Sequence, residues 1–488
     1  MKVNASFAVA SKPPAARAAI VFGFLISALG SVASPTPMPV VLSGLCLAFL
    51  VHLLWDARDP PILLLPALFQ WSEVAILPLS TIWEQVPLQS LSIYGADIES
   101  SAAFGLAGVA SLGLGLRIGS GSSKRQSFKQ RIEIEASLWG YDQIKRYAFT
   151  IMAMGYLFSA ISNVAGPARE LFLHLAEIKY AGLFSFAYWC LRRDRHLGVL
   201  TSVMLFEITF GMTGFFAEFK FSILTLFVAA LASRPRLGFR DVVIVGLAGA
   251  TIMFVAIFWT AVKPGYRMFV NRGSGAQFVD VALTDRLDYL SAAAGGITGE
   301  KFADGFNRLV SRHGYIEYLA LTMAHVPAGA PHEDGNLTKA VIEHLLFPRI
   351  FFPDKPPLPS DTVITAKYTG LGYIWNENTS ISIGNIGELY IDFGYIGALF
   401  GIGIIGIIVG YVYHFLRDHS STSALISASL CILPSLSLAY FGTAYIKLIG
   451  SVFYASIIAM LIQRFIARFK DLKANEFLSR NTEMHKLR

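Results

Sequence analysis

The stretch Tyr395-Ile-Gly-Ala-Leu-Phe-Gly-Ile-Gly-Ile-Ile-Gly-Ile-Ile-Val-Gly-Tyr-Val-Tyr-His-Phe-Leu416 decides the fold class of this chain. It contains no Lys, Arg, Asp or Glu, and as a helix it is long enough to cross the roughly 30 Å apolar core of a bilayer. Its two Gly-x-x-x-Gly pairs, Gly397–Gly401 and Gly406–Gly410, are typical of membrane helices that pack closely together. We therefore expect a transmembrane helix within residues 386–416.

Eleven further apolar stretches predict a polytopic, all-α membrane helix bundle with about twelve transmembrane helices. Nine precede a long connection of residues 263–385 and form an N-terminal membrane part, 1–262. Three lie in 386–466, and 467–488 form a basic tail. The expected spans are 17–33, 38–55, 60–82, 100–116, 147–163, 176–191, 197–214, 216–232, 241–262, 386–416, 421–439 and 443–463.

The overall composition agrees with a membrane protein. Of the 488 residues, 54% are hydrophobic and 15% are charged, and the mean hydropathy is +0.54. A soluble surface must carry many more charges, so this composition excludes a soluble enzyme, a disordered protein and a nucleic-acid-binding protein. Cys46, Cys190 and Cys431 all lie in apolar stretches, with neither metal-ligand spacing nor a disulfide framework.

The distribution of basic residues predicts the orientation. With the N-terminus inside, the inner segments collect 25 of the 40 Lys and Arg residues, and the short outer connections are nearly free of them. This is the positive-inside asymmetry. It predicts cytoplasmic termini, and it accounts for the pI of about 9.1 without a nucleic-acid partner.

The connection 263–385 is expected on the outer side and is long enough to be functional. Residues 304–323 have apolar residues at helical spacing. We therefore expect short helices here that cover the bundle, and no β-sheet.

Several charged residues lie in or at the rim of the predicted spans, where charge is costly and marks candidate functional sites. They are Glu73, Glu207, Glu388, Asp392 and Lys447, with Glu218 and Lys220 at a short outer turn. Most of them also have a simpler interpretation. Glu73 and Glu207 are also explained as polar groups between packed helices. Lys447 is also explained as a side chain that extends to the membrane–water interface. Glu218 and Lys220 are also explained as parts of a solvated turn.

Known catalytic motifs are missing from the sequence. There is no Walker-type phosphate loop, no Gly-x-Ser-x-Gly motif and no His, Cys or carboxylate cluster with clear metal spacing. We therefore expect neither a metal nor a cofactor. Arginines of the outer connection remain, and arginine can hold phosphate without a metal.

Two segments carry a resemblance to a known family. The first is Pro348-Arg349-Ile-Phe-Phe-Pro353-Asp-Lys-Pro356, and the second is Gly387-Glu388-Leu-Tyr390-Ile-Asp-Phe-Gly394-Tyr-Ile-Gly397. Together they resemble the bacterial O-antigen and exopolysaccharide repeat-unit polymerases, whose layout of many helices and one large periplasmic loop is similar. The turn from Gly211 to Lys220 is also similar, but lysine stands where arginine is commoner.

The resemblance implies a metal-independent glycosyltransferase with a GT-C-like fold in the bacterial inner membrane. Its donor and acceptor would be polyprenyl-pyrophosphate-linked glycans, polymerised into O-antigen, capsule or exopolysaccharide on the periplasmic side. The implied partners are these lipid-linked glycans, the bilayer and a chain-length regulator protein.

The expected site follows from that chemistry. Arg286, Arg312, Arg349 and Lys220 are the candidates for binding pyrophosphate, because all four are expected at the outer rim. Glu388 is the first candidate for general base or acceptor positioning, although its carboxylate is also explained by the dipole of the helix that it begins. His313 and Glu317, next to Arg312, are the alternates.

Three other functions compete with polymerisation. A ligase that transfers finished glycan shares the general layout. A lipid-linked oligosaccharide flippase or another transporter is compatible with twelve helices, but transporters usually show internal repeats, and none is visible here. A purely structural scaffold would not explain the charges at the rim.

Overall fold

A computed structural model describes residues 12–121, 127–214, 219–234, 239–274, 279–347, 351–352, 354–355, 359–372, 381–418 and 423–486, without the side chains of 239–252 and 469–486. Every regular element in these ranges is a helix, and they contain no β-strand. The all-α class predicted from the sequence is therefore confirmed for the described part of the chain.

Each of the twelve predicted spans corresponds to a helix. In chain order these are α1 (Pro14–Ala33), α2 (Pro37–Leu54), α3 (Leu64–Glu84), α4 (Ile98–Ser120), α6 (Tyr141–Ser162), α8 (Ile178–Arg193), α9 (Leu197–Met212), α10 (Phe219–Ser233), α11 (Phe239–Val270), α17 (Asn385–Asp418), α18 (Ala424–Ser437) and α19 (Tyr445–Lys486). The connections between them add α5 (Phe128–Leu138), α7 (Arg169–Ala176) and two short 3₁₀ helices, Leu88–Leu91 and Gly166–Ala168.

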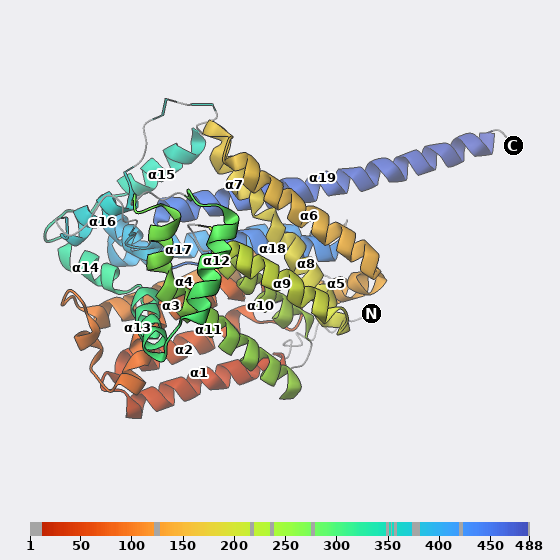
Figure 1. Ribbon diagram of the computed structural model, residues 1–488. Coiled ribbons are helices and arrows are strands. Elements are labelled where there is room, and N and C mark those ends of the chain that lie inside the picture. The colour runs from red at the N-terminus through yellow and green to blue at the C-terminus, as the bar shows by residue number, and fades with distance from the viewer. Residues whose placement is uncertain are drawn as a thin grey trace, which may run out of the picture.

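Five helices are long and apolar enough to cross a membrane, namely α1, α2, α4, α17 and the Tyr445–Arg468 part of α19. Three shorter helices, α9, α10 and α18, are also apolar. Together they indicate a polytopic membrane protein. Beyond its membrane part, α19 continues as a helix to Lys486 and projects from the bundle (Figure 1).

Helices α4 and α17 pack tightly because glycines line both sides of their contact. A Cβ atom on Gly115 would lie 2.1 Å from the carbonyl oxygen of Gly403, and one on Gly406 would lie 2.6 Å from that of Leu112. The expected close packing is thus confirmed for the Gly406–Gly410 pair. Gly397 and Gly401 instead lie against side chains of their own helix, near Gly394, whose positive φ of 65° breaks the α17 helix.

This contact gives a stability prediction. We expect Gly115→Ala to lower the free energy of unfolding by about 1–3 kcal/mol, because the added methyl group overpacks a backbone contact. Gly198→Ala is the matched control, since a Cβ there meets nothing within 4 Å. Thermal unfolding of the purified protein in detergent would measure both variants, and equal melting temperatures would contradict the prediction.

The connection after α11 forms short helices at one end of the bundle, as expected. They are α12 (Leu283–Gly295), α13 (Gly299–His313), α14 (Glu317–His325), α15 (Asn336–Leu346) and α16 (Asp361–Thr369). The helical periodicity predicted over 304–323 corresponds to α13 and α14. Helix α13 approaches α11 closely, since a Cβ on Gly305 would lie 2.9 Å from both Ile257 and Ala261.

The predicted end of the ninth span at residue 262 differs from the structure, in which α11 continues through Pro264 to Val270. The Pro264-Gly265 pair is typical of a helix end. In the structure, however, α11 remains helical through both residues and packs against α12 and α13.

The short helices of residues 283–369 and the basic connections lie at opposite ends of the bundle. At one end, the segment after α2 meets α5 and the end of α17: Lys129 N donates to Arg58 O at 2.9 Å, and Arg417 pairs with Asp59 at 2.9 Å. At the other end, Glu317 of α14 accepts a hydrogen bond from Ser92, and Asp361 of α16 pairs with Lys447 of α19. Figure 1 shows α13, α14 and α16 on the side of the molecule away from α5.

Candidate functional site

Four basic side chains from three helices lie close enough for their charges to interact at the end of the bundle that α13 covers. They are Lys220 of α10, Lys263 and Arg267 of α11, and Arg312 of α13. Lys263 interacts electrostatically with the other three, and Lys220 interacts with Arg267 and Arg312. We call these four residues the cationic cluster.

The continuation of α11 builds half of this cluster. Lys263 and Arg267 are four residues apart, so an unbroken helix places them on one face. Arg312 belongs to the last turn of α13, which lies along α11 because Gly305 permits a close approach. Lys220 lies in the first turn of α10, so the cluster forms where three helix ends meet.

One buried carboxylate accompanies the cluster. Glu73 of α3 interacts electrostatically with Lys220 and accepts hydrogen bonds from the backbone N–H groups of Phe441 and Gly442. These two residues belong to the connection between α18 and α19. Glu73 thus fixes that connection beside the cluster.

Aromatic rings line the same region. The Lys220 ammonium lies 5.3 Å from the centroid of the Tyr440 ring, which in turn contacts the Phe69 ring edge-to-face at 4.8 Å. A cation over an aromatic face is stabilised by the ring quadrupole. Tyr440 therefore helps to hold Lys220 at the cluster.

His313 adjoins the cluster as a neutral group. Its Nε2 atom is 2.9 Å from the Ser72 hydroxyl, and its ring contacts Phe69 edge-to-face at 5.5 Å. Burial, and then the positive charge of Lys220, lower the pKa of His313 to about 4. The imidazole is therefore unprotonated at neutral pH and able to accept a proton.

This environment predicts the titration of His313. In the purified protein with no anion added, we expect a midpoint near pH 4, and we expect Lys220→Met to raise it toward the ordinary value of about 6.5, because a nearby positive charge is removed. Selective histidine labelling and NMR would measure the midpoint, with His313→Gln assigning the signal. A midpoint near 6.5 in the unaltered protein would contradict the expectation.

The cluster carries excess positive charge that solvent can reach. Lys220 and Arg312 are exposed, and Lys263 and Arg267 are half-buried. Among the described residues, no carboxylate lies within ion-pair distance of Lys220, Lys263 or Arg312. Among the residues that the structure describes, Glu73 is the carboxylate whose charge couples to Lys220. This arrangement is suited to an anion with several negative oxygens, such as a diphosphate.

A metal-binding group is not found in the described part of the chain, where no three His, Cys, Asp or Glu side chains come together. Burial and the neighbouring cations lower the pKa of Lys263 to about 7, so a bound anionic group would favour its charged form, and the cluster is suited to bind such a group. Such charges stabilise negative charge that develops on a leaving group.

Three of the seven predicted site residues come together here, namely Lys220, Arg312 and His313. Arg286 of α12 lies elsewhere: its Nη1 atom donates to the Thr213 carbonyl oxygen at 2.7 Å, at the end of α9. Arg349 lies outside the described residues.

The other two predicted residues hold the backbone of neighbouring segments. Glu388 is 3% exposed, and its Oε2 atom accepts a hydrogen bond from the Tyr445 N–H at the start of α19 at 3.1 Å. Glu317 accepts hydrogen bonds from the Ser92 hydroxyl at 2.8 Å and from the Tyr94 N–H at 3.0 Å. Both carboxylates therefore join the covering helices or α17 to other parts of the bundle.

Most of the other charged residues singled out from the sequence also have partners. Glu207 accepts hydrogen bonds from Tyr156 and Ser222, as expected for a polar group between packed helices. Asp392 accepts from Leu337 N and Thr338 N in the first turn of α15. Lys447 pairs with Asp361.

Lys263, Arg267 and Glu73 were not among the seven residues of the expected site, although Glu73 was one of the charged residues singled out in the predicted spans and Arg267 one of the arginines of the outer connection. Glu73 had a visible signal, because it is a carboxylate inside an apolar stretch. Lys263 and Arg267 are four residues apart, which places them on one face of a helix. This was not predicted, because the helix was expected to end at residue 262.

Comparison with known proteins adds no further identification, because no family model, curated protein or solved structure matches this chain.

Proposed function

We propose that the protein is a membrane glycosyltransferase that polymerises polyprenyl-pyrophosphate-linked oligosaccharide repeat units into O-antigen, capsule or exopolysaccharide. The single observation that carries this proposal is the cationic cluster at one end of an apolar helix bundle, to which α13 contributes Arg312. The sequence resemblance at Gly387 to Gly397 and at Pro348 to Pro356 supplies the reaction class.

The site suits a substrate that is both lipid and anion. A polyprenyl chain requires an apolar environment, and a diphosphate requires positive charge at the rim of the bilayer. Lys220, Lys263, Arg267 and Arg312 provide that charge next to apolar helices. When the bond between the anomeric carbon and the diphosphate breaks, the diphosphate gains negative charge, and preorganised cations lower the energy of that state.

His313 is the best-placed of the three predicted proton acceptors. It is unprotonated at neutral pH because burial and Lys220 lower its pKa to about 4. A bound diphosphate would offset the charge of Lys220, which raises the pKa of His313 and makes it a stronger base. In this scheme the acceptor hydroxyl transfers its proton to His313 as its oxygen bonds to the anomeric carbon, and the diphosphate departs into the cluster.

The orientation proposed for the inner membrane places both termini in the cytoplasm and residues 263–385 in the periplasm. A reporter that is active only in the periplasm should therefore be active when fused at Ala330, between α14 and α15. A reporter that is active only in the cytoplasm serves as the control at the same position. Activity of the cytoplasmic reporter alone would invert the topology.

The glycan phenotype of a deletion strain tests the function. Loss of a polymerase leaves single repeat units on the final acceptor, and reintroducing the gene restores long chains. Long chains that remain lipid-linked would identify a ligase instead, and repeat units trapped on the cytoplasmic side would identify a flippase. Either of those results would overturn the proposal.

A further inference from the structure

Helix α15 has an apolar face that the rest of the protein covers only in part. On the inner side of the helix, Val341 is buried and Leu345 packs against the bundle. Next to them, Ile342 and Leu346 are exposed, and Leu346 is 66% exposed. These two residues are four apart, so they share one side of the helix. The apolar face of α15 is therefore wider than its contact with α17 and α19.

Three phenylalanines extend this face past the end of α15. Phe347, Phe351 and Phe352 are exposed, and the rings of Phe347 and Phe352 contact each other edge-to-face at 5.1 Å. The Lys355 ammonium donates to the Phe347 carbonyl oxygen at 2.8 Å, which ties this segment to the helix end. Contiguous apolar surface of this kind is typical of a contact with a membrane or another protein. We call the five exposed residues the α15 patch: Ile342, Leu346, Phe347, Phe351 and Phe352.

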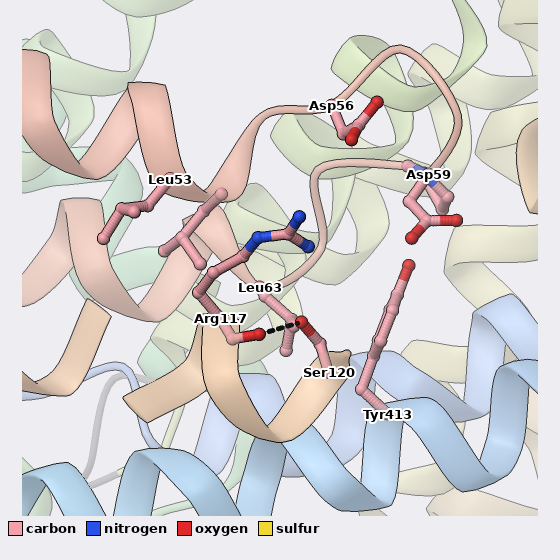
Figure 2. Close-up of a pocket in the computed structure, with 9 residues that line it drawn as sticks. Leu53, Asp56, Asp59, Leu63, Arg117, Ser120 and Tyr413 are labelled. Carbon is pink, nitrogen blue, oxygen red and sulfur yellow. Dashed lines mark hydrogen bonds between the residues drawn. The ribbon is translucent and has the colours of Figure 1, made fainter. Parts of the chain in front are cut away.

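Helix α17 shows where the two membrane surfaces lie. Its residues 395–413 form a continuous helix, about 27 Å long at 1.5 Å per residue, which is close to the roughly 30 Å apolar core of a bilayer. At one end of this run, the hydroxyl end of Tyr413 points toward Asp59, and Arg117 lies nearby (Figure 2). Charged residues avoid the apolar core, so this end marks one membrane surface. The start of the run, near residue 395, then lies at the level of the other surface.

Both ends of α15 are attached to the bundle near that second level. At its start, the Thr338 N–H donates to Asp392 of α17 at 2.7 Å. Near its end, Leu345 would lie 3.8 Å from a Cβ atom on Gly450, five residues into the membrane part of α19, or about 7.5 Å along that helix. Figure 1 shows α15 beside the start of α19, at the margin of the bundle. Helix α15 therefore lies along the membrane surface and slightly below it.

We propose that the α15 patch inserts into the bilayer at the boundary between lipid head groups and acyl chains, as an amphipathic helix lying in the membrane plane. Such helices bury their apolar face by roughly 5–10 Å, which matches the depth of the Gly450 contact. Asn336 and Glu343, seven residues apart, are exposed and form the polar side of α15. They remain among the head groups and water.

A bilayer covers the patch better than a second protein does, because the patch continues a surface that already faces lipid. Phe453 lies three residues after Gly450 on a neighbouring position of α19 and is 39% exposed. It belongs to a helix long and apolar enough to cross a membrane. The lipid that surrounds this part of α19 therefore also meets the α15 patch. This inference uses only the membrane part and does not depend on the proposed function.

Spin labelling of the full chain in lipid nanodiscs tests the proposal. The three native cysteines, all buried, are first replaced by alanine, and a nitroxide is then attached to single cysteines. We expect labels at Ile342→Cys and Phe351→Cys to collide more often with oxygen, which concentrates among acyl chains, than with a water-soluble nickel chelate. Labels at the matched controls Asn336→Cys and Glu343→Cys should show the opposite preference.

A second measurement uses the unaltered protein. A phosphatidylcholine with a photoactivated diazirine in the first part of its acyl chain should form adducts on the peptide that contains Ile342 and Phe351. Preferential nickel collisions at these two positions, or no adducts there, would overturn the proposal. Protection from both reagents, with spin–spin broadening that disappears on dilution with unlabelled protein, would identify a second copy as the cover and would also overturn it.

Discussion

Replacement of Arg312 by alanine is expected to reduce the proposed polymerisation at least ~100-fold, the loss typical of removing one group that stabilises developing negative charge. Arg312 is the only member of the cationic cluster contributed by α13, and no carboxylate among the described residues pairs with it. Arg312→Lys should retain part of the activity, because lysine keeps the charge but loses the bidentate geometry. The measurement is chain elongation by the purified protein on lipid-linked repeat units.

Arg308→Ala is the matched control for this experiment. Arg308 lies one turn earlier on α13, but it is exposed and pairs with Asp304 at 2.8 Å. We expect the control to elongate chains at the normal rate. Full activity in a folded Arg312→Ala protein would remove the cationic cluster from the reaction, and equal losses in both variants would show that α13 itself was disturbed.

Replacement of Arg417 by methionine is expected to lower the free energy of unfolding by about 3 kcal/mol, the low end of the cost of breaking a buried pair, because it leaves the partly buried carboxylates of Asp59 and Asp418 without their counter-charge. The Arg417 side chain is fully buried at the end of α17, and it donates to Asp59 and Asp418, each at 2.9 Å, and to the Ser120 carbonyl oxygen at 3.0 Å. The variant should therefore loosen the contact between α17, α4 and the α2–α3 connection. Thermal unfolding in detergent would show this as a lower melting temperature.

Two comparisons identify the cause of that loss. Arg234→Met removes a more exposed pair with Asp194 and should cost only about 0–1 kcal/mol. Adding Asp59→Leu to Arg417→Met should restore part of the stability, because the uncompensated carboxylate is then gone. Equal melting temperatures for Arg417→Met and Arg234→Met would contradict the expected contribution of burial.

The apolar stretches were sufficient to predict the helices of the membrane part, because each of the twelve corresponds to a helix in the structure. The glycine pattern Gly406–Gly410 also indicated close packing correctly, although it did not identify α4 as the partner. That choice depends on Gly115 and Gly119, which only the three-dimensional pairing of α4 with α17 brings opposite.

The candidate site was harder to predict. Lys220, Arg312 and His313 were chosen for charge and chemistry at the outer rim, and the structure brings them together. The four-residue spacing of Lys263 and Arg267 did not indicate a shared helix face, because Pro264 predicts a helix end. In the structure α11 continues as one helix and packs against α13. Tertiary contacts of this kind are not encoded in local sequence.

The buried carboxylates that accept backbone hydrogen bonds have a consequence for mutational scanning. Glu73, Glu317, Glu388 and Asp392 each bind N–H groups of a segment distant in sequence. Alanine at any of them would release a connection or a helix start, and the proposed glycan synthesis would fall as steeply as after loss of a reacting group. A screen that scores only the polymer would rank these four beside Arg312, and a parallel score for the amount of folded protein in the membrane would separate the two classes.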